Sequence, residues 1–316
     1  MANAVASALD LELVRCRETW FSSGEGKLVI EENVRGCDLY VFQSAVDPAS
    51  GRSVYDNLMM ALHAVEAAAL SDAGRITAVL PYYPGARQDK RKGRTREGIS
   101  AGLVARMLQA AGAGRVLTVE IHNEAIAGMF DPGRCQLENV QLHKHLALWA
   151  RQQGLCGDTV VSPDVGGLER ARNYAEALQL NIAAISKQRD YRQASVVRNS
   201  TLIGEVEGHD VMLVDDIVDT AGSVVGACEE LKLRGAGDIT VLCAHALLSG
   251  PAISRLDGLA QRAEQEGWRF CLVGTSSIRR PDPPAWYRSF DLEPLVAKVI
   301  RNLHSHGSVT SAQDEA

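Results

Sequence analysis

The sequence predicts an α/β protein of two similar domains, each a mainly parallel sheet flanked by helices. Residues 34–83 and 206–247 share one layout of strand, loop, helix and strand. Short Val, Ile and Leu runs with little polar alternation are typical of strands buried on both faces, and helices between them are typical of parallel crossovers. A length of 316 residues also favours two domains, at roughly 150 residues each.

The remaining elements follow from the same patterns. After "GIS", a helix is expected near residues 100–111, with Ser100 as its cap. Further strands are expected at "RVLTVEI", "TVVSPD" and "IAAIS", and further helices near 141–153, 167–178 and 290–304. The tail "SHGSVTSAQDEA" is expected to be disordered. We therefore divide the chain into residues 1–140 and 141–316.

Composition excludes several classes of protein. Hydrophobic residues make up 46% and charged residues 23%, without an apolar run of 18 or more, so we expect no membrane segment. The first residues lack a basic region and carry Asp10 and Glu12, which argues against a signal peptide and favours the cytoplasm. Seven scattered cysteines form no zinc pattern, and a net charge of −6 argues against nucleic acid as a partner.

The stretch "VMLVDDIVDTAGS", residues 211–223, passes from a buried strand into acidic and then small residues. Ligands of open α/β sheets bind beyond the carboxyl ends of strands. The loop at the following helix start offers N–H groups and hydroxyls to a phosphate, while Asp215 and Asp216 suit sugar hydroxyls. The pattern favours a sugar phosphate site over the alternative, a capped helix with structural aspartates. The residues of this candidate site are Asp215, Asp216, Asp219, Thr220, Ala221, Gly222 and Ser223.

This stretch resembles the phosphoribosyl-diphosphate motif shared by type I phosphoribosyltransferases and ribose-phosphate pyrophosphokinases. The rest of the chain is similar to the second family, in motif order and spacing, over roughly residues 20–305. The motifs are "FSSGE", "EENVRG", "ARQDK", "EIHNEAIAGMFD", "VVSPDVGGLERA" and "ISKQR". The resemblance implies two phosphoribosyltransferase-type (type I) domains. It also implies transfer of the β,γ-diphosphoryl group of Mg-ATP to the 1-hydroxyl of ribose 5-phosphate, giving phosphoribosyl diphosphate and AMP.

The resemblance also assigns roles near the reaction centre. Lys187 and Arg189 match the family's catalytic loop, where both cations stabilise the transition state and the arginine approaches the ribose phosphate. His122 and Asp164 match residues that help to hold Mg²⁺. An acid at a strand end before a glycine-rich helix start independently supports Asp164.

Two further segments match the ATP site of the family. Arg87 and Gln88 match its ATP-binding pair, since a guanidinium can bind phosphate oxygens and an amide can read a base or ribose. The other segment, which a neighbouring subunit contributes in this family, comprises Phe21, Ser23, Gly24 and Glu25. Such a shared site implies a homo-oligomer, usually a hexamer built of dimers.

Some positions depart from the family pattern. Ser23 replaces the usual Asp or Asn, Glu120 replaces Asp before the metal histidine, and Cys135 and Gln136 replace Asp-Asn at the regulatory phosphate and ADP site. We therefore expect weak activation by phosphate and weak inhibition by ADP. The alternatives are a non-catalytic regulatory paralogue associated with a true synthetase and, less favoured, a type I phosphoribosyltransferase.

Overall fold

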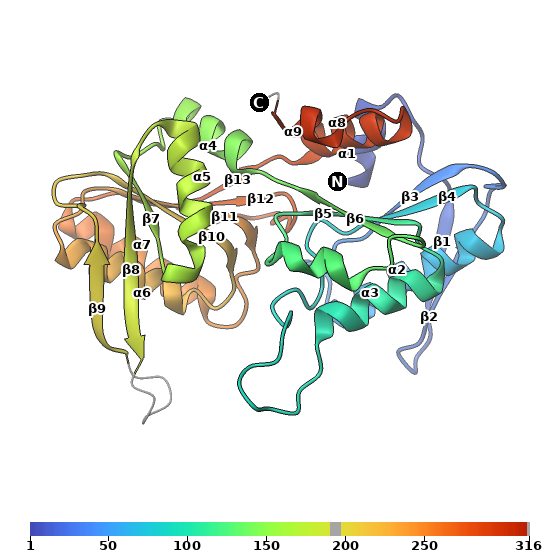
Figure 1. The fold of residues 1–316 in the computed structure, drawn as a ribbon, viewed down its shortest axis with the longest axis horizontal. Helices are drawn as coiled ribbons and strands as arrows, with labels where there is room; N and C mark the ends of the chain where they lie inside the picture. The colour runs from blue at the N-terminus through green and yellow to red at the C-terminus, as the bar shows by residue number, and fades with distance from the viewer. Residues whose placement is uncertain (190–196, 315–316) are drawn as a thin grey trace. The chain divides into compact units, whose positions relative to one another are not determined.

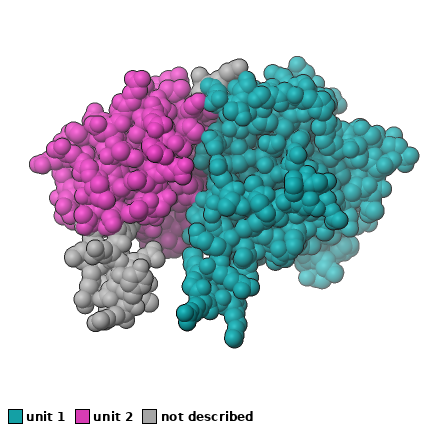
Figure 2. Space-filling view, in the orientation of Figure 1, with its two compact units in different colours: residues 1–141, 276–280, 292–315 teal, residues 142–275, 281–291, 316 magenta. Residues whose placement is uncertain are grey.

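The computed structural model describes residues 1–189 and 197–314, with backbone alone at residues 187–189 and 197–200. The chain forms two compact units (Figure 2). Unit 1 comprises Met1–Gln141, Ser276–Arg280 and Leu292–Glu315, and unit 2 comprises Leu142–Thr275 and Pro281–Asp291. The linear division at residue 140 assigned the terminal helix to the second half, whereas compactness groups it with the first.

Unit 1 contains a parallel sheet in the order β3-β4-β5-β6. Its strands are β3 (Asp38–Phe42), β4 (Arg75–Val79), β5 (Arg115–Val119) and β6 (Gln136–Val140). The helices α2 (Val54–Leu70) and α3 (Ser100–Ala111) cover one face and bury Ile76, Ala78 and Val116 beneath them. A separate antiparallel hairpin is formed by β1 (Cys16–Trp20) and β2 (Gly26–Ile30).

The start of α3 differs from the expectation. Ile99, not Ser100, is the N-cap residue, and it makes no side-chain cap bond. Ser100 is the first helical residue, and its hydroxyl donates a hydrogen bond to the Gln88 side chain. The serine therefore ties the helix to the preceding loop, because a partner outside the helix takes its hydroxyl.

The chain ends complete unit 1, and Figure 1 shows α1 (Ala2–Ala8) and α8 (Glu293–His304) on the sheet face opposite α2 and α3. Arg301 Nη2 donates to the Ala8 carbonyl at 3.1 Å, and His304 Nδ1 lies 2.9 Å from Asp38 Oδ2. The expected disorder of the tail is wrong for α9 (Val309–Asp314), whose Ala312 is fully buried. A short 3₁₀ helix, η1 (Glu124–Met129), follows β5.

Unit 2 contains a seven-stranded sheet in the order β13-β12-β11-β10-β7-β8-β9, parallel except for the β8–β9 pair. Its strands are β7 (Thr159–Ser162), β8 (Asn181–Arg189), β9 (Val197–Ile203), β10 (Val211–Val218), β11 (Ile239–Ala246), β12 (Phe270–Thr275) and β13 (Tyr287–Phe290). Its helices are α4 (His143–Gln152), η2 (Val165–Gly167), α5 (Leu168–Leu178), α6 (Gly222–Leu233) and α7 (Ala252–Glu266).

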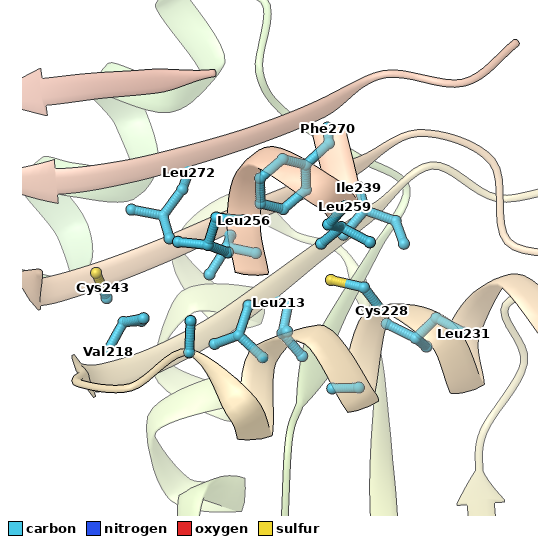
Figure 3. Close-up of a cluster of buried hydrophobic side chains, with 14 of the residues drawn as sticks. Leu213, Val218, Cys228, Leu231, Ile239, Cys243, Leu256, Leu259, Phe270 and Leu272 are labelled. Atoms are coloured by element: carbon cyan, nitrogen blue, oxygen red, sulfur yellow. The ribbon is translucent and has the colours of Figure 1, made fainter. Parts of the chain in front are cut away.

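Both faces of this sheet are buried, as the aliphatic runs predict. Along β10, Val211 and Leu213 join the core beneath α6 and α7, while Met212 and Val214 join the core beneath α4 and α5. Figure 3 shows the first of these cores, with Leu213 between the strands and the helices. Because β10 has no solvent face, its position is fixed from both sides. In the described part of the chain, no helix is long and apolar enough to cross a membrane.

Three aspartates join the amino ends of the strands in unit 2. Asp158 Oδ2 accepts from the Asp210 N–H at 3.0 Å, Asp210 Oδ1 from the Asp238 N–H at 2.8 Å, and Asp238 Oδ1 from the Arg269 N–H at 2.7 Å. These residues precede β7, β10, β11 and β12 in turn. Each side chain thus satisfies a backbone donor at the start of the neighbouring strand.

Candidate active site

The predicted phosphate loop lies between β10 and α6. Ala221 is the N-cap residue of α6 and has φ 58°, a left-handed conformation that non-glycine residues rarely adopt. Arg255 of α7 holds the loop by donating from Nη1 to the Thr220 carbonyl at 2.9 Å, and the Ser249 N–H donates to the Asp219 carbonyl at 2.9 Å. The first N–H groups of α6 have no partner within the helix, so the loop and helix start suit an anion.

The two predicted sugar-binding acids lie at the carboxyl end of β10. Asp216 is 5% exposed and Asp215 is half-buried. Burial, together with the neighbouring Asp216 carboxylate, raises the pKa of Asp215 to about 8. Asp215 Oδ1 also accepts a hydrogen bond from the Asp216 N–H at 2.9 Å. Two adjacent, partly desolvated carboxyls are acceptors for a diol, provided that their charge is balanced.

Arg170 supplies part of that balance. Its Nη1 lies 3.7 Å from Asp215 Oδ1 and 3.5 Å from Asp216 Oδ1, and its charge opposes the rise in the pKa of Asp215. The sequence analysis quoted this residue within a motif but gave it no role. A signal existed: Arg170 is the third residue of α5, where a cation opposes the helix dipole and therefore needs an anionic partner.

Asp164 follows β7 in the same unit. Its Oδ1 accepts from the Gly167 N–H at 3.0 Å and so caps η2, while its carboxyl group stays exposed. The loop packs closely at Gly167, where a Cβ would lie 2.8 Å from Ser162 Oγ and would force one of the two to move. The segment holds Asp164 at the same sheet edge as the acids of β10, because β7 and β10 are parallel neighbours.

In unit 1, the loop of Arg87 and Gln88 meets the loop of His122. Asp89, next to Gln88, accepts a hydrogen bond from Asn123 Nδ2, and Asn123 Oδ1 accepts from the Ala125 N–H at 3.0 Å. Arg87, Gln88 and His122 are exposed. The two loops therefore present a guanidinium, an amide and an imidazole on one surface of the unit.

The residues predicted to reach a neighbouring subunit form the turn of the β1–β2 hairpin. The Gly24 N–H donates to the Phe21 carbonyl at 2.9 Å, and Gly24 has φ 88°, which favours glycine. Ser23 Oγ donates to Glu25 Oε2 at 2.9 Å. Phe21 is 51% exposed, so its ring is available for stacking.

The predicted catalytic cations lie at the end of β8. The backbone at Lys187 pairs with Ser200 and that at Arg189 pairs with Val197 of β9. Their side chains, and residues 190–196 of the predicted catalytic stretch, lie outside the described residues.

The predicted metal ligands belong to different units, His122 to unit 1 and Asp164 to unit 2. Among residues 1–189 and 197–314, no group of three or more His, Cys, Asp or Glu side chains could hold a metal ion. The exposed Asp164 carboxylate has the oxygen chemistry that Mg²⁺ prefers, whereas an imidazole is a less usual partner. Either side chain alone would leave most coordination positions of a cation to water or to a ligand.

The β10–α6 site and the parallel sheet define an α/β protein of the phosphoribosyltransferase class. A model of the N-terminal domain of ribose phosphate pyrophosphokinase matches residues 1–112, and a phosphoribosyl transferase domain model matches residues 136–278. The chain therefore belongs to the ribose-phosphate pyrophosphokinase family, a family of diphosphotransferase enzymes, and both the predicted fold class and the predicted family are confirmed.

Individual relatives agree. Ribose-phosphate pyrophosphokinase 2 of Enterococcus faecalis is 43% identical over 98% of this chain and 91% of its own length. The ribose-phosphate pyrophosphokinase of Oceanobacillus iheyensis is 38% identical over 98% of this chain and 92% of its own. The crystal structure of phosphoribosylpyrophosphate synthetase from Mycobacterium smegmatis has a TM-score of 0.84 and 34% identity, covering 97% of this chain and 95% of that one.

Proposed function

We propose that this protein is a ribose-phosphate diphosphokinase. It transfers the β,γ-diphosphoryl group of Mg-ATP to the 1-hydroxyl of ribose 5-phosphate and releases AMP and 5-phosphoribosyl 1-diphosphate. The observation that carries this proposal is the pair Asp215–Asp216 near the end of β10, with the loop at the start of α6 beginning after two intervening residues. The acids accept the sugar hydroxyls, and the loop with Thr220 and Ser223 binds the 5-phosphate.

The residues of unit 1 supply the nucleotide side of the reaction in this proposal. Arg87 binds ATP phosphates and Gln88 reads the base or ribose, in the loop that Asn123 fastens to the loop of His122. Phe21, Ser23, Gly24 and Glu25 complete the ATP site from a neighbouring subunit, with Phe21 stacked on adenine. The half-exposed Phe21 ring supports this role because a free aromatic side chain at a hairpin turn gains from a planar partner.

His122 and Asp164 would hold Mg²⁺ with the nucleotide. The bound cation supplies charge neutralisation on the phosphate oxygens. Lys187 and Arg189 add fixed positive charge where negative charge develops on the transferred group, and Arg189 also approaches the ribose phosphate. In this proposal residues 1–140 provide the ATP-binding residues, and residues 141–316 provide the ribose 5-phosphate loop and the catalytic cations.

We further propose a hexamer built of dimers, since the hairpin turn serves a neighbour's ATP site, and a cytoplasmic location, in which the seven free cysteines stay reduced. Sedimentation velocity of the purified protein tests the assembly. A monomer at micromolar concentration would contradict a shared site.

The direct test mixes purified protein with Mg-ATP and ribose 5-phosphate and follows AMP and phosphoribosyl diphosphate. Equal amounts of both products support the proposal. If neither product forms, with or without inorganic phosphate, the regulatory paralogue replaces it. Release of diphosphate from phosphoribosyl diphosphate by an added nucleobase would instead indicate a phosphoribosyltransferase.

A further inference from the structure

Unit 2 carries two adjoining cavities at the amino end of β12. Their volumes are about 310 Å³ and about 480 Å³, and they share Arg269, Phe270, Ala285 and Trp286 as walls. Because β10, β11 and β12 are parallel, this edge of the sheet is opposite the one where the phosphate loop follows β10. Figure 3 likewise shows Phe270 and Val218 at opposite ends of the core. The cavities are therefore separate from the sugar phosphate site.

Three indole rings contribute to the walls, so we call the joined cavities the indole groove. Trp149 lines the smaller cavity, Trp268 the larger, and Trp286 both. These are three of the four tryptophans of the chain. Trp286 is only 8% exposed and belongs to the core beneath α6 and α7, while Trp149 and Trp268 are partly buried, so the groove is lined by the accessible parts of rings that the cores hold.

The rings are held in place before any ligand arrives. Trp286 Nε1 donates to Asp257 Oδ1 at 2.8 Å, and its ring centroid lies 6.1 Å from that of Phe270. Trp149 makes an edge contact with Phe290, at 5.7 Å between centroids. Rings fixed in this way lose little conformational entropy on binding, which is a property of preformed ligand sites.

The smaller cavity is positively charged. Arg269 and Arg288 line it, and no carboxylate does. Arg288 Nη1 donates to the carbonyls of Ala285 and Tyr287, both at 2.9 Å, and it makes no ion pair with any side chain that the structure describes. Arg269 forms an ion pair with Asp238, whose Oδ2 lies 3.3 Å from Arg269 Nε. The guanidinium of Arg288 is therefore oriented by two carbonyls while its charge stays uncompensated.

We propose that the indole groove binds a small aromatic carboxylate, with its ring between Trp149 and Trp286 and its carboxylate on Arg288. A cavity of about 310 Å³ suits one or two fused rings. Guanidinium–carboxylate pairing supplies orientation, and offset or edge contacts with indole supply affinity. This site goes beyond the proposed diphosphokinase reaction and does not depend on it.

The probe for this site is 2-naphthoate, added to full-length protein that carries 5-fluorotryptophan. Each of the four tryptophans then gives one fluorine resonance, and the variants Trp20→Phe, Trp149→Phe and Trp286→Phe identify their signals. We expect the resonances of Trp149 and Trp286 to move in a saturable way while that of Trp20 in unit 1 stays. Saturating Mg-ATP and ribose 5-phosphate should leave the titration unchanged, because they bind elsewhere.

Two comparisons test the role of charge. Arg288→Gln should weaken binding of 2-naphthoate about tenfold, and 2-naphthamide should bind the unaltered protein about tenfold less well than the carboxylate. Arg35→Gln is the matched control, since Arg35 is an exposed residue of unit 1 that pairs with Asp72 and lines neither cavity. No saturable shift at millimolar probe, equal affinity of the amide, or equal loss in both arginine variants would each overturn the proposal.

Discussion

Replacing Arg170 by methionine tests whether this side chain prepares the acid pair for ribose. The guanidinium lies 3.5 and 3.7 Å from the two carboxylates and only 20% of its side chain is exposed. At an effective dielectric constant near 20, a charge pair at such a distance interacts by about 4 kcal/mol. Without Arg170, protonation of Asp215 would limit the energetic cost, and an arginine neighbour commonly lowers the pKa of an aspartate by about 1–3 units. We take the lower figure, about 1.4 kcal/mol for one unit.

The expected result is a shift in the pH dependence of kcat/KM for ribose 5-phosphate. In the unaltered enzyme this parameter should rise with pH through about 8, as Asp215 loses its proton. Loss of the Arg170 charge disfavours the carboxylate, so the midpoint should move up by at least about one unit, with about tenfold lower kcat/KM at pH 7.5. The KM for ATP should change less than about twofold.

Initial-rate profiles between pH 6 and 10 provide the measurement. Arg172→Met is the matched control, because Arg172 lies on the same helix but is exposed and pairs with Glu176 at 3.9 Å. Arg170→Lys should restore part of the pH shift, since a point charge returns without the fork geometry. An unmoved midpoint in Arg170→Met, with an unchanged KM for ribose 5-phosphate, would refute the role of Arg170.

Other substitutions separate binding from chemistry. The pKa of Asp215 rises on folding from 3.8 to about 8, so the folded state binds the proton more tightly and stability falls as pH rises across that window. Asp215→Asn should therefore raise the free energy of unfolding in urea by about 1–3 kcal/mol at pH 8.5, with no gain at pH 4. The same variant should lose ribose 5-phosphate binding. Equal changes in stability at both pH values would contradict the direction of the pKa shift. Lys187→Ala should lower kcat by at least about 100-fold with Kd for both substrates largely unchanged by calorimetry, and an unaltered kcat would remove this lysine from the mechanism. Asp219→Ala should instead raise the KM for ribose 5-phosphate, which steady-state kinetics measures, and an effect on ATP alone would argue against its place in the loop. Because Cys135 and Gln136 replace the usual regulatory pair, inorganic phosphate should activate weakly and ADP should inhibit competitively with ATP alone; strong phosphate dependence would disprove this.

The sequence predicts where the residues of the candidate sugar phosphate site lie in the fold, because that site is local. Asp215, Asp216 and the loop that follows occupy one continuous segment, so the strand–loop–helix pattern alone places them at a sheet edge. Arg170 comes from a different helix, and its position over the acids depends on how α5 packs on β10. Contacts between distant segments are hard to predict from one sequence. Here the one indication was that Arg170 is a cation near the start of a helix.

Contacts between distant segments also explain two other differences between the predicted and the observed structure. Ser100 carries the features of a helix cap, but the Gln88 side chain takes its hydroxyl, a choice that local propensity does not contain. The tail from residue 305 is polar and small, yet Asn302 Nδ2 donates to the Ser308 carbonyl at 2.7 Å and Ala312 is buried. Tertiary contacts thus order a segment whose composition alone is typical of disorder.

The hydrogen bonds of Asp158, Asp210 and Asp238 make the amino edge of the sheet of unit 2 more constrained than its carboxyl edge. At the amino edge a carboxylate fastens the starts of β7, β10, β11 and β12 to one another in turn, so a length change in one of the connections that enter there would break a bond shared by two strands. At the carboxyl edge the loops that follow β7 and β10 carry the residues proposed to bind the substrates. Loop insertions and substitutions should therefore be tolerated mainly at the carboxyl edge, which lets substrate recognition diverge in evolution while the strand register stays the same.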